Sequence, residues 1–200
     1  MKPEIEVKFL IVNHDEVRAK LKALSAKLEN PERLMRRAML DTPDRKFRTG
    51  KSFQRLRVRD EGNKVTLTVK IGRDVDKGYA QEVETVVGSF DTTIELFKSI
   101  GFEVYSFQES KRETWKLLDV EVVLDEWPWA APYIEIEGQT EDLIKEVAIK
   151  LGFDWSARIH GSVDEVYMRD YPKMKYGDSI GEISEVRFGD PLPKYLKEKL

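Results

Sequence analysis

Residues 4–8 read Glu4-Ile5-Glu6-Val7-Lys8, a stretch in which charged side chains alternate with β-branched apolar ones. Because alternate side chains of a β-strand point to opposite faces of its sheet, this stretch predicts a strand with one charged face and one apolar face. The same alternation occurs further along the chain, at residues 56–59, 65–70, 82–84, 119–125 and 133–137. The pattern predicts a sheet that keeps its charged side chains on a single face.

Helices are predicted between these strands, over residues 13–28, 91–101 and 140–152. Asn13 and Thr140 stand at the start of the first and third helices, and side chains of these types cap helix N-termini. The last two helices end at a glycine, which readily adopts the left-handed backbone found just after a helix. Apolar residues recur at helical spacing in all of them, so they are expected to cover the apolar face of the sheet.

The composition limits the possible classes of function. Of the 200 residues, 36% are charged, yet the net charge is only −3, which argues against general binding of nucleic acid or of an anionic membrane. The absence of cysteine excludes thiol catalysis and thiolate metal sites and is typical of a reducing compartment. The chain shows neither an apolar signal core nor an apolar run of membrane length, and a cytoplasmic location is predicted.

The charged strand faces favour a closed sheet. Carboxylates concentrate on some strands and arginine or lysine on others, while the opposite faces carry apolar residues that need cover. For any single strand the alternative is a solvated face with cross-strand ion pairs. A sheet curled into a barrel, with the charges inside and the helices outside, accounts for both features. The predicted fold class is therefore α+β, a closed antiparallel β-barrel with helices packed outside.

A lumen that contains both signs of charge predicts a bound ligand, because unpaired buried charges cost several kcal/mol each. Carboxylates favour the hard cations Mg²⁺ or Mn²⁺, whereas arginine and lysine favour phosphate oxygens. Together they predict phosphoryl or nucleotidyl transfer. The two histidines, His14 and His160, share no pattern that predicts a zinc site or a hydrolytic triad, and His14 is expected to be exposed.

The segment Glu4-Ile5-Glu6-Val7-Lys8 resembles the Glu-x-Glu-x-Lys hallmark of the CYTH, or triphosphate tunnel metalloenzyme, superfamily. This superfamily includes class IV adenylyl cyclases, thiamine triphosphatases, inorganic tripolyphosphatases and fungal-type RNA triphosphatases. Further matching segments follow in the expected order: Met39-Leu40-Asp41-Thr42-Pro43, Leu56-Arg57-Val58-Arg59, Leu67-Thr68-Val69-Lys70, Glu82-Val83-Glu84, Leu124-Asp125-Glu126 and Ile134-Glu135-Ile136-Glu137. The resemblance implies an eight-stranded tunnel domain over residues 1–168. Residues 169–200 lie outside it and are expected to form an extension packed on or near the barrel.

The resemblance also implies roles for individual charged residues. The implied metal ligands are Glu4, Glu6, Asp125, Glu135 and Glu137, and they would hold one or two Mg²⁺ or Mn²⁺ ions. The implied triphosphate-binding residues are Lys8, Arg57, Arg59, Lys70 and Arg112. Lys8, Glu4 and Glu6 are expected to be catalytic. Glu82, Glu84 and Glu121 would also face the lumen.

Two places depart from the family pattern. Family members commonly show Lys-x-Arg where this chain reads Ser110-Lys111-Arg112, so serine stands in place of the lysine and Lys111 is expected to point the other way. Arg37 stands where relatives often carry an acidic residue. Both changes affect positions expected to influence substrate binding, and the resemblance therefore does not select one substrate within the family.

Three functions stay open on the sequence alone. The first is a triphosphatase that acts on a small molecule such as tripolyphosphate, a nucleoside triphosphate or thiamine triphosphate. The second is an adenylyl cyclase, for which Trp127 and Trp129 offer either a surface for stacking a base or simple packing residues. The third is a non-catalytic binder of polyphosphate or RNA ends, since residues 33–59 contain ten Lys/Arg against two acidic residues. The oligomeric state is not fixed, and a homodimer is one option.

Overall fold

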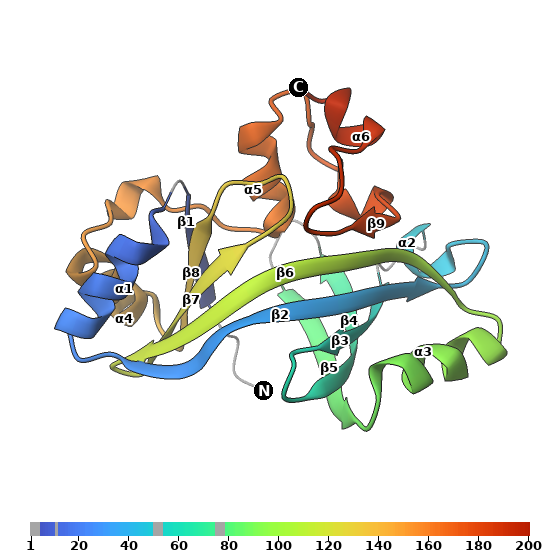
Figure 1. Ribbon diagram of the computed structural model, residues 1–200, viewed down its shortest axis with the longest axis horizontal. Coiled ribbons are helices and arrows are strands. Elements are labelled where there is room, and N and C mark those ends of the chain that lie inside the picture. Colours follow the sequence, from blue (N-terminus) through green and yellow to red (C-terminus); the bar gives the residue numbers. More distant parts are fainter. Residues whose placement is uncertain (1–4, 11, 50–53, 75–78) are drawn as a thin grey trace. The chain divides into compact units, whose positions relative to one another are not determined.

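The computed structural model describes residues 5–10, 12–49, 54–74 and 79–200, and its fold is of the α+β class (Figure 1). Within these ranges nine strands and six α-helices form. Hydrogen bonds join the strands in the order β1-β8-β7-β6-β2-β3-β4-β5, and β9 pairs with β6. None of the helices in this part of the chain combines the length and the apolar character that crossing a bilayer requires.

The chain divides into two compact units. Unit 1 consists of residues 1–33, 110–178 and 192–200, and unit 2 of residues 34–109 and 179–191. The strands β2 (Lys27–Asp41) and β6 (Glu103–Leu117) are long enough to contribute to both. Each unit has its own apolar core.

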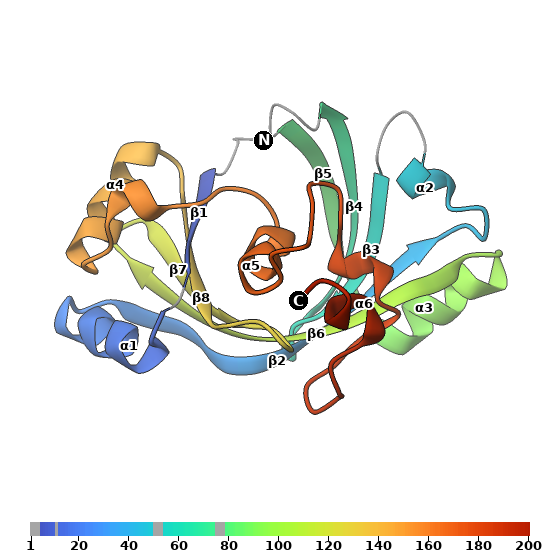
Figure 2. The ribbon, with the colours of Figure 1, turned by 90° about the horizontal axis from the view of Figure 1, so that it is seen from above.

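The sheet of unit 1 contains β1 (Ile5–Leu10), β7 (Val120–Glu126) and β8 (Tyr133–Gly138). Two helices, α1 (His14–Ala23) and α4 (Glu141–Lys150), lie beside these strands on one side (Figure 2). Apolar residues of strands and helices form a common core there: Val7, Phe9, Val122, Leu124, Ile134 and Ile136 pack with Val17, Leu21, Ile144, Val147 and Leu151. The apolar half of the alternating pattern is therefore covered by helices in this unit, as predicted.

The first helix is shorter than predicted. α1 ends at Ala23, whereas the sequence places its end near Leu28. Ser25 has a left-handed backbone with φ of 57°, and the amide of Ala26 donates to the carbonyl of Leu21, which closes the helix. β2 begins directly afterwards, so Leu28 is a strand residue with an exposed side chain.

The other two helices lie where the sequence predicts them. The side chain of Thr140 caps α4, and that of Ser89 caps α3 (Phe90–Ser99). Both helices are followed by a glycine with positive φ, at 97° in Gly101 and 81° in Gly152. These glycines adopt the left-handed backbone that ends a helix at low cost.

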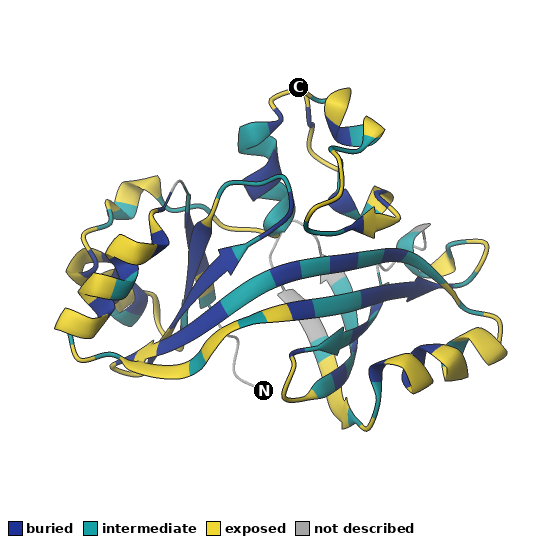
Figure 3. Ribbon diagram, in the orientation of Figure 1, coloured by how far each residue is buried: buried dark blue, intermediate teal, exposed yellow. Residues whose placement is uncertain are grey.

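The sheet of unit 2 contains β3 (Gln54–Asp60), β4 (Val65–Asp74) and β5 (Tyr79–Val87), preceded by the short helix α2 (Lys46–Thr49). α3 packs on one face of this sheet and turns its exposed side outward (Figure 3). The buried core between them consists of Ala38, Leu40, Leu56, Val58, Phe90 and Ile94. Here too the apolar face of the sheet has a helical cover.

Asp60 holds the turn between β3 and β4. Its carboxylate accepts a hydrogen bond from Arg36 at 2.5 Å and one from the amide of Gly62 at 2.8 Å. Burial alone would raise the pKa of Asp60, but the bonds from Arg36 and Gly62 outweigh it and lower the pKa below its ordinary value. A carboxyl with a lowered pKa stabilises the fold at pH above its ordinary value, and this contribution disappears as the pH falls through the lowered pKa.

We therefore expect Asp60→Asn to lower the free energy of unfolding by about 1 kcal/mol near neutral pH. The loss should shrink towards zero at an acid pH below the lowered pKa, where the wild-type carboxyl is protonated as well. Urea unfolding at both pH values measures the two losses. A loss of the same size at acid and neutral pH would contradict the assigned role of the carboxylate.

The chain after residue 162 takes part in both units. α5 (Val163–Asp170) and α6 (Lys194–Lys197) belong to unit 1, whereas β9 (Glu185–Val186) belongs to unit 2. They contribute buried side chains, among them Tyr171, Met174, Ile180, Ile183, Val186 and Leu196. The division into a domain over residues 1–168 and an extension over residues 169–200 stays a prediction.

A closed barrel is not confirmed. In the part of the chain that the structure describes, β1 and β5 are the two ends of the hydrogen-bonded strand order. At β1, the edge that does not face β8 is engaged at one point, because Lys8 and Ile159 exchange backbone hydrogen bonds of 2.9 and 3.0 Å. The antiparallel main sheet and its cover of helices are confirmed.

Candidate functional site

Unit 1 places its predicted site residues on the sheet face opposite α1 and α4. Directly opposite residues in an antiparallel pair share a face. The register pairs Lys8 with Glu135 and Glu6 with Glu137 between β1 and β8. It also pairs Glu121 with Glu137 between β7 and β8, and Arg112 with Asp125 between β6 and β7. Glu4 lies outside the described residues.

Arg112 joins two buried carboxylates on this face. Its Nε donates to Asp125 Oδ1 at 2.8 Å, and its Nη2 donates to Glu135 Oε2 at 2.7 Å and to the second oxygen of Asp125. Burial alone would lower the pKa of Arg112, but the charges of Asp125 and Glu135 outweigh it and raise the pKa. The three groups form a fixed charged cluster across β6, β7 and β8.

Lys8 is almost fully buried and has three oxygen partners. Its Nζ donates to Glu6 Oε1 and to the carbonyl of Gly161, both at 2.7 Å, and lies 3.3 Å from Glu135 Oε1. Burial would lower the pKa of Lys8, but Glu135 and Glu6 outweigh it and raise the pKa. Burial likewise would raise the pKa of Glu135, but Arg112 and Lys8 lower it. Lys8 therefore presents a permanent positive charge beside the carboxylates.

A small cavity opens beside two of the predicted carboxylates. It has a volume of about 170 Å³ and is lined by Glu121, Glu137, Glu29, Asp119, Lys116, Gly138 and Gln139. The cavity is predominantly acidic, with one lysine among four carboxylates. It is large enough for a small number of water molecules or a hydrated ion.

Unit 2 carries the remaining predicted cations on the sheet face opposite α3. Arg57 of β3 lies opposite Thr68 of β4. On the other side of β4, Thr68 lies opposite Glu84 of β5, and Lys70 lies opposite Glu82. Arg57 Nη2 donates to Glu82 Oε1 at 3.3 Å, and Lys70 Nζ is 3.8 Å from Glu82 Oε2. Glu82 thus lies between two of the predicted phosphate-binding cations and holds both loosely.

Arg59 has a partner that the sequence analysis missed. Its Nη2 is 2.6 Å from Glu61 Oε1 and 3.6 Å from Glu84 Oε2. Glu61 follows β3 in the turn, where the alternating pattern has ended. Arg55, two residues before Arg57, is a further cation on this face that continued alternation would have identified.

The guanidinium groups of Arg57 and Arg59 are incompletely satisfied. Among the described residues, the Nε of each is buried without a hydrogen-bond partner. Burial first, and then the nearby charge of Arg59, lowers the pKa of Arg57 to about 10, which keeps the group charged at neutral pH. A buried cationic donor without an acceptor is costly, so this pair of side chains is suited to an anionic ligand.

The acidic residues fit a divalent cation in donor type but form no preassembled site. Carboxylate oxygens without histidine or cysteine suit Mg²⁺ or Mn²⁺. Within residues 5–10, 12–49, 54–74 and 79–200, no three acidic or histidine side chains are grouped closely enough to hold a metal ion. Among the described carboxylates, Glu6 contacts Lys8, whereas Asp125 and Glu135 contact Arg112.

The departures from the family pattern have clear positions. Lys111 points away from the charged face, as predicted, since it lies opposite Glu126 and its Nζ is 3.7 Å from that carboxylate. Ser110 is buried. Arg37 lies in register with Arg59 and adds a further positive charge to the face of unit 2.

The burial of two ring side chains, His14 and Trp127, bears on expectations from the sequence. His14 is buried, not exposed, and its Nε2 lies 2.9 Å from the carbonyl of Tyr133. Trp127 is buried, and the carbonyl of Trp129 accepts a hydrogen bond from the Tyr171 hydroxyl at 2.7 Å. This loop is held by packing and hydrogen bonds to the C-terminal part of unit 1, which favours the packing alternative for the tryptophans.

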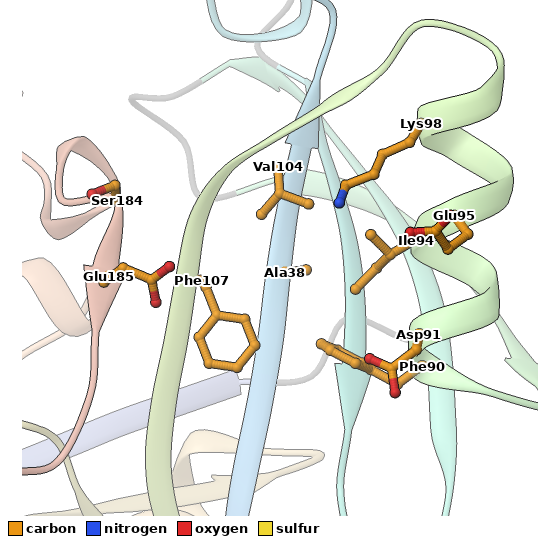
Figure 4. A pocket seen from close by; sticks show the side chains of 10 residues that line it. All are labelled: Ala38, Phe90, Asp91, Ile94, Glu95, Lys98, Val104, Phe107, Ser184 and Glu185. Atoms are coloured by element: carbon orange, nitrogen blue, oxygen red, sulfur yellow. The ribbon is translucent and has the colours of Figure 1, made fainter.

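A second cavity lies in unit 2, away from these residues. It has a volume of about 350 Å³ and lies between α3, β6 and β9, on the helix-covered side of the sheet. Figure 4 shows Phe90, Ile94 and Phe107 at its floor and Asp91 and Lys98 at the side of α3. None of the predicted site residues lines it, so it is separate from the charged face.

Comparisons with known proteins concern the family and the fold of this chain. The family model of the CYTH domain matches residues 2–160. A solved protein from Pyrococcus horikoshii OT3 is 28% identical, with a TM-score of 0.64 over 82% of this chain and 99% of that one. A candidate adenylate cyclase from Vibrio parahaemolyticus is 18% identical, with a TM-score of 0.68 over 82% of this chain and 97% of that one.

A candidate adenylyl cyclase from Hippeastrum with a dominant triphosphatase activity is 15% identical, with a TM-score of 0.55 over 85% of this chain and 96% of that one. No curated protein matches the sequence. The likeness to the Vibrio and Hippeastrum proteins concerns the fold alone. The family model, in contrast, spans most of the chain, including all the strands that carry the charged faces. This chain is a member of the CYTH domain family.

Proposed function

We propose that this protein is a Mg²⁺- or Mn²⁺-dependent triphosphatase that hydrolyses a phosphoanhydride bond of a triphosphate-containing small molecule. The observation that carries the proposal is the buried pair Arg57 and Arg59, each with an Nε that has no acceptor among the described residues. An anion with several oxygens would satisfy these donors. Membership of the CYTH family supports a triphosphate as that anion.

The proposal assigns binding to the cations of both units. Arg57, Arg59 and Lys70 would bind phosphate oxygens while Glu82 and Glu84 keep these side chains in place. Lys8 and Arg112 would supply positive charge from unit 1. We further propose that the sheet closes into a tunnel around the substrate, with residues 1–168 as the catalytic domain.

The acidic residues of unit 1 would hold the metal ions. Glu6, Asp125, Glu135 and Glu137 are the candidates, together with Glu4, which lies outside the described residues. A divalent cation, when bound, would neutralise part of the negative charge that develops on the phosphoryl oxygens. Lys8, held by Glu6 and by the carbonyl of Gly161, keeps its ammonium group fixed beside these carboxylates. It would stabilise negative charge on the reacting phosphate at low cost in reorganisation.

Product analysis tests the proposal. Tripolyphosphate and ATP are incubated with the protein and Mg²⁺ or Mn²⁺, and the products are compared between wild type and Glu6→Gln. We expect release of orthophosphate by the wild type and a loss of at least about a hundredfold in the variant, as removal of a group that stabilises developing charge typically produces. Glu126→Gln, on the other face of the same sheet, is the matched control and should retain activity.

The other outcomes discriminate between the alternatives. Cyclic AMP and pyrophosphate from ATP would identify an adenylyl cyclase. Tight binding of tripolyphosphate without turnover of either compound would leave a binding module. Turnover that is the same in Glu6→Gln and wild type would remove the assigned role of the carboxylate.

A further inference from the structure

Two arginines stack on one tyrosine in unit 2. The guanidinium carbon of Arg48 lies 4.6 Å from the ring centroid of Tyr105, and that of Arg45 lies 5.3 Å from it. Burial raises the pKa of the Tyr105 phenol, while the charges of Arg48, Arg55 and Arg45 act in the opposite direction. Two guanidinium groups therefore contact a single, half-buried aromatic side chain.

The local backbone holds this arrangement in place. Asp41 is fully buried, and its carboxylate accepts hydrogen bonds from the amides of Phe47 at 3.1 Å and Arg48 at 3.3 Å. Arg45 has a left-handed backbone with φ of 57°, although this conformation costs a residue with a side chain roughly 1–2 kcal/mol. Strain of this kind persists where the surrounding structure enforces it, often at binding sites.

The arginine cluster continues the charged face of unit 2. Arg55 precedes Arg57 by two residues on β3, so both side chains lie on the same face of the sheet. Tyr105 lies within the electrostatic reach of Arg55. On the neighbouring strand β2, Met39 lies opposite Arg57, so Asp41, two residues further on, shares the face of Arg57 and accepts a hydrogen bond from the amide of Arg48. This places the start of the Arg48 side chain beside the charged face of unit 2.

A carboxylate from the C-terminal part of the chain already contacts this cluster. Glu182 forms a hydrogen-bonded ion pair with Arg48, and its side chain is 50% exposed. The segment that carries Glu182 is attached through other groups, because the Ser106 hydroxyl donates to the carbonyl of Ile183 at 2.7 Å and the amide of Phe107 donates to that of Ser184 at 2.8 Å. The Glu182 side chain can therefore leave Arg48 while the segment stays attached.

We propose that Arg45, Arg48 and Tyr105 form a second anion-binding site for a phosphate group, and that Glu182 is its internal, displaceable occupant. The inference rests on the proposed function, in that the phosphate would belong to the polyanion bound at Arg57 and Arg59. A half-exposed ion pair contributes only about 0–1 kcal/mol, so a multiply charged phosphate competes with it effectively. Glu182 thus limits how tightly and how far along the face a polyanion binds.

Binding of inorganic tripolyphosphate by Glu182→Gln tests the proposal. Isothermal titration calorimetry without added metal requires no turnover. We expect the affinity to rise about twofold to fivefold over wild type, which corresponds to the loss of a competitor worth up to about 1 kcal/mol. Arg48→Gln should weaken binding, and the double variant should show no gain from Glu182→Gln.

Glu185→Gln is the matched control. Glu185 lies in the same segment, is exposed to a similar degree and forms an ion pair of 2.6 Å with Arg187, which is outside the cluster. Equal affinity of Glu182→Gln and Glu185→Gln would overturn the proposal, as would weaker binding by Glu182→Gln than by wild type. Because binding is measured without hydrolysis, a lack of triphosphatase activity would not by itself decide the outcome. Conversely, an active enzyme with no response to Glu182→Gln would refute only the second site.

Discussion

Arg112→Gln is expected to lower the free energy of unfolding by about 3–5 kcal/mol. The substitution removes the guanidinium group that donates to both Asp125 and Glu135, and both carboxylates are buried. Breaking a buried ion pair by deleting one partner leaves an uncompensated charge, which accounts for a loss of this size. Urea unfolding followed by circular dichroism measures it.

The neighbouring residue provides the control. Lys111 lies on the opposite face, where its Nζ is 3.7 Å from Glu126, and its side chain is 40% exposed. Lys111→Gln should cost at most about 1 kcal/mol, as exposed ion pairs do. Arg112→Lys should fall between the two, because a lysine retains the charge but not the fork of donors. A loss for Arg112→Gln no larger than that for Lys111→Gln would show that the cluster is not what holds β6 to β7 and β8.

The second large effect concerns binding. In Arg57→Gln/Arg59→Gln we expect the affinity for tripolyphosphate to fall by at least about a hundredfold, since each charge-assisted hydrogen bond contributes about 1.5–3 kcal/mol. Stability should fall as well, because the substitutions remove the ion-pair partners of Glu61 and Glu82, although the burial and the neighbouring charge that lower the pKa of Arg57 offset part of the loss. Calorimetric titration and urea unfolding of the same preparation separate the two properties.

Arg36→Gln is the control for this prediction. Arg36 lies on the neighbouring strand β2, and its guanidinium lies 5.0 Å from the Phe90 ring on the α3 side and bonds to Asp60. Its loss should reduce stability slightly and leave binding unchanged. If the double variant bound tripolyphosphate within about threefold of wild type, the arginines of β3 would not be the phosphate site, whatever the enzyme hydrolyses.

Local patterns were sufficient for much of the fold. Alternation places Glu6 and Lys8 on one face of β1 and Val7 on the other, and the structure has this arrangement because the strand geometry leaves no alternative. Helix starts at Ser89 and Thr140 depend on one side chain and its nearest amides, so the sequence reveals them to within a few residues. These features depend on neighbours in the chain.

Features that depend on distant residues were missed. His14 is buried, and its Nε2 lies within hydrogen-bond distance of the carbonyl oxygen of Tyr133, a residue more than a hundred positions away in the sequence. One local feature was missed too: α1 ends early at Ser25, which has a left-handed backbone although it is not a glycine. The pairing of Arg112 with Asp125 and Glu135 follows from the register of three strands, and no spacing within one strand could indicate it.

The way in which the two units share the chain has a consequence for how the protein reaches its native state during synthesis. The chain passes from one unit to the other after residues 33, 109, 178 and 191. Unit 1 therefore has its full set of segments only when its final portion, residues 192–200, has left the ribosome. Domains generally fold as units during translation, N-terminal parts first, but here the N-terminal strand β1 belongs to the unit that is completed last. Strand β1 is accordingly expected to wait for residues 192–200 before unit 1 is complete, and removal of residues 192–200 should impair unit 1.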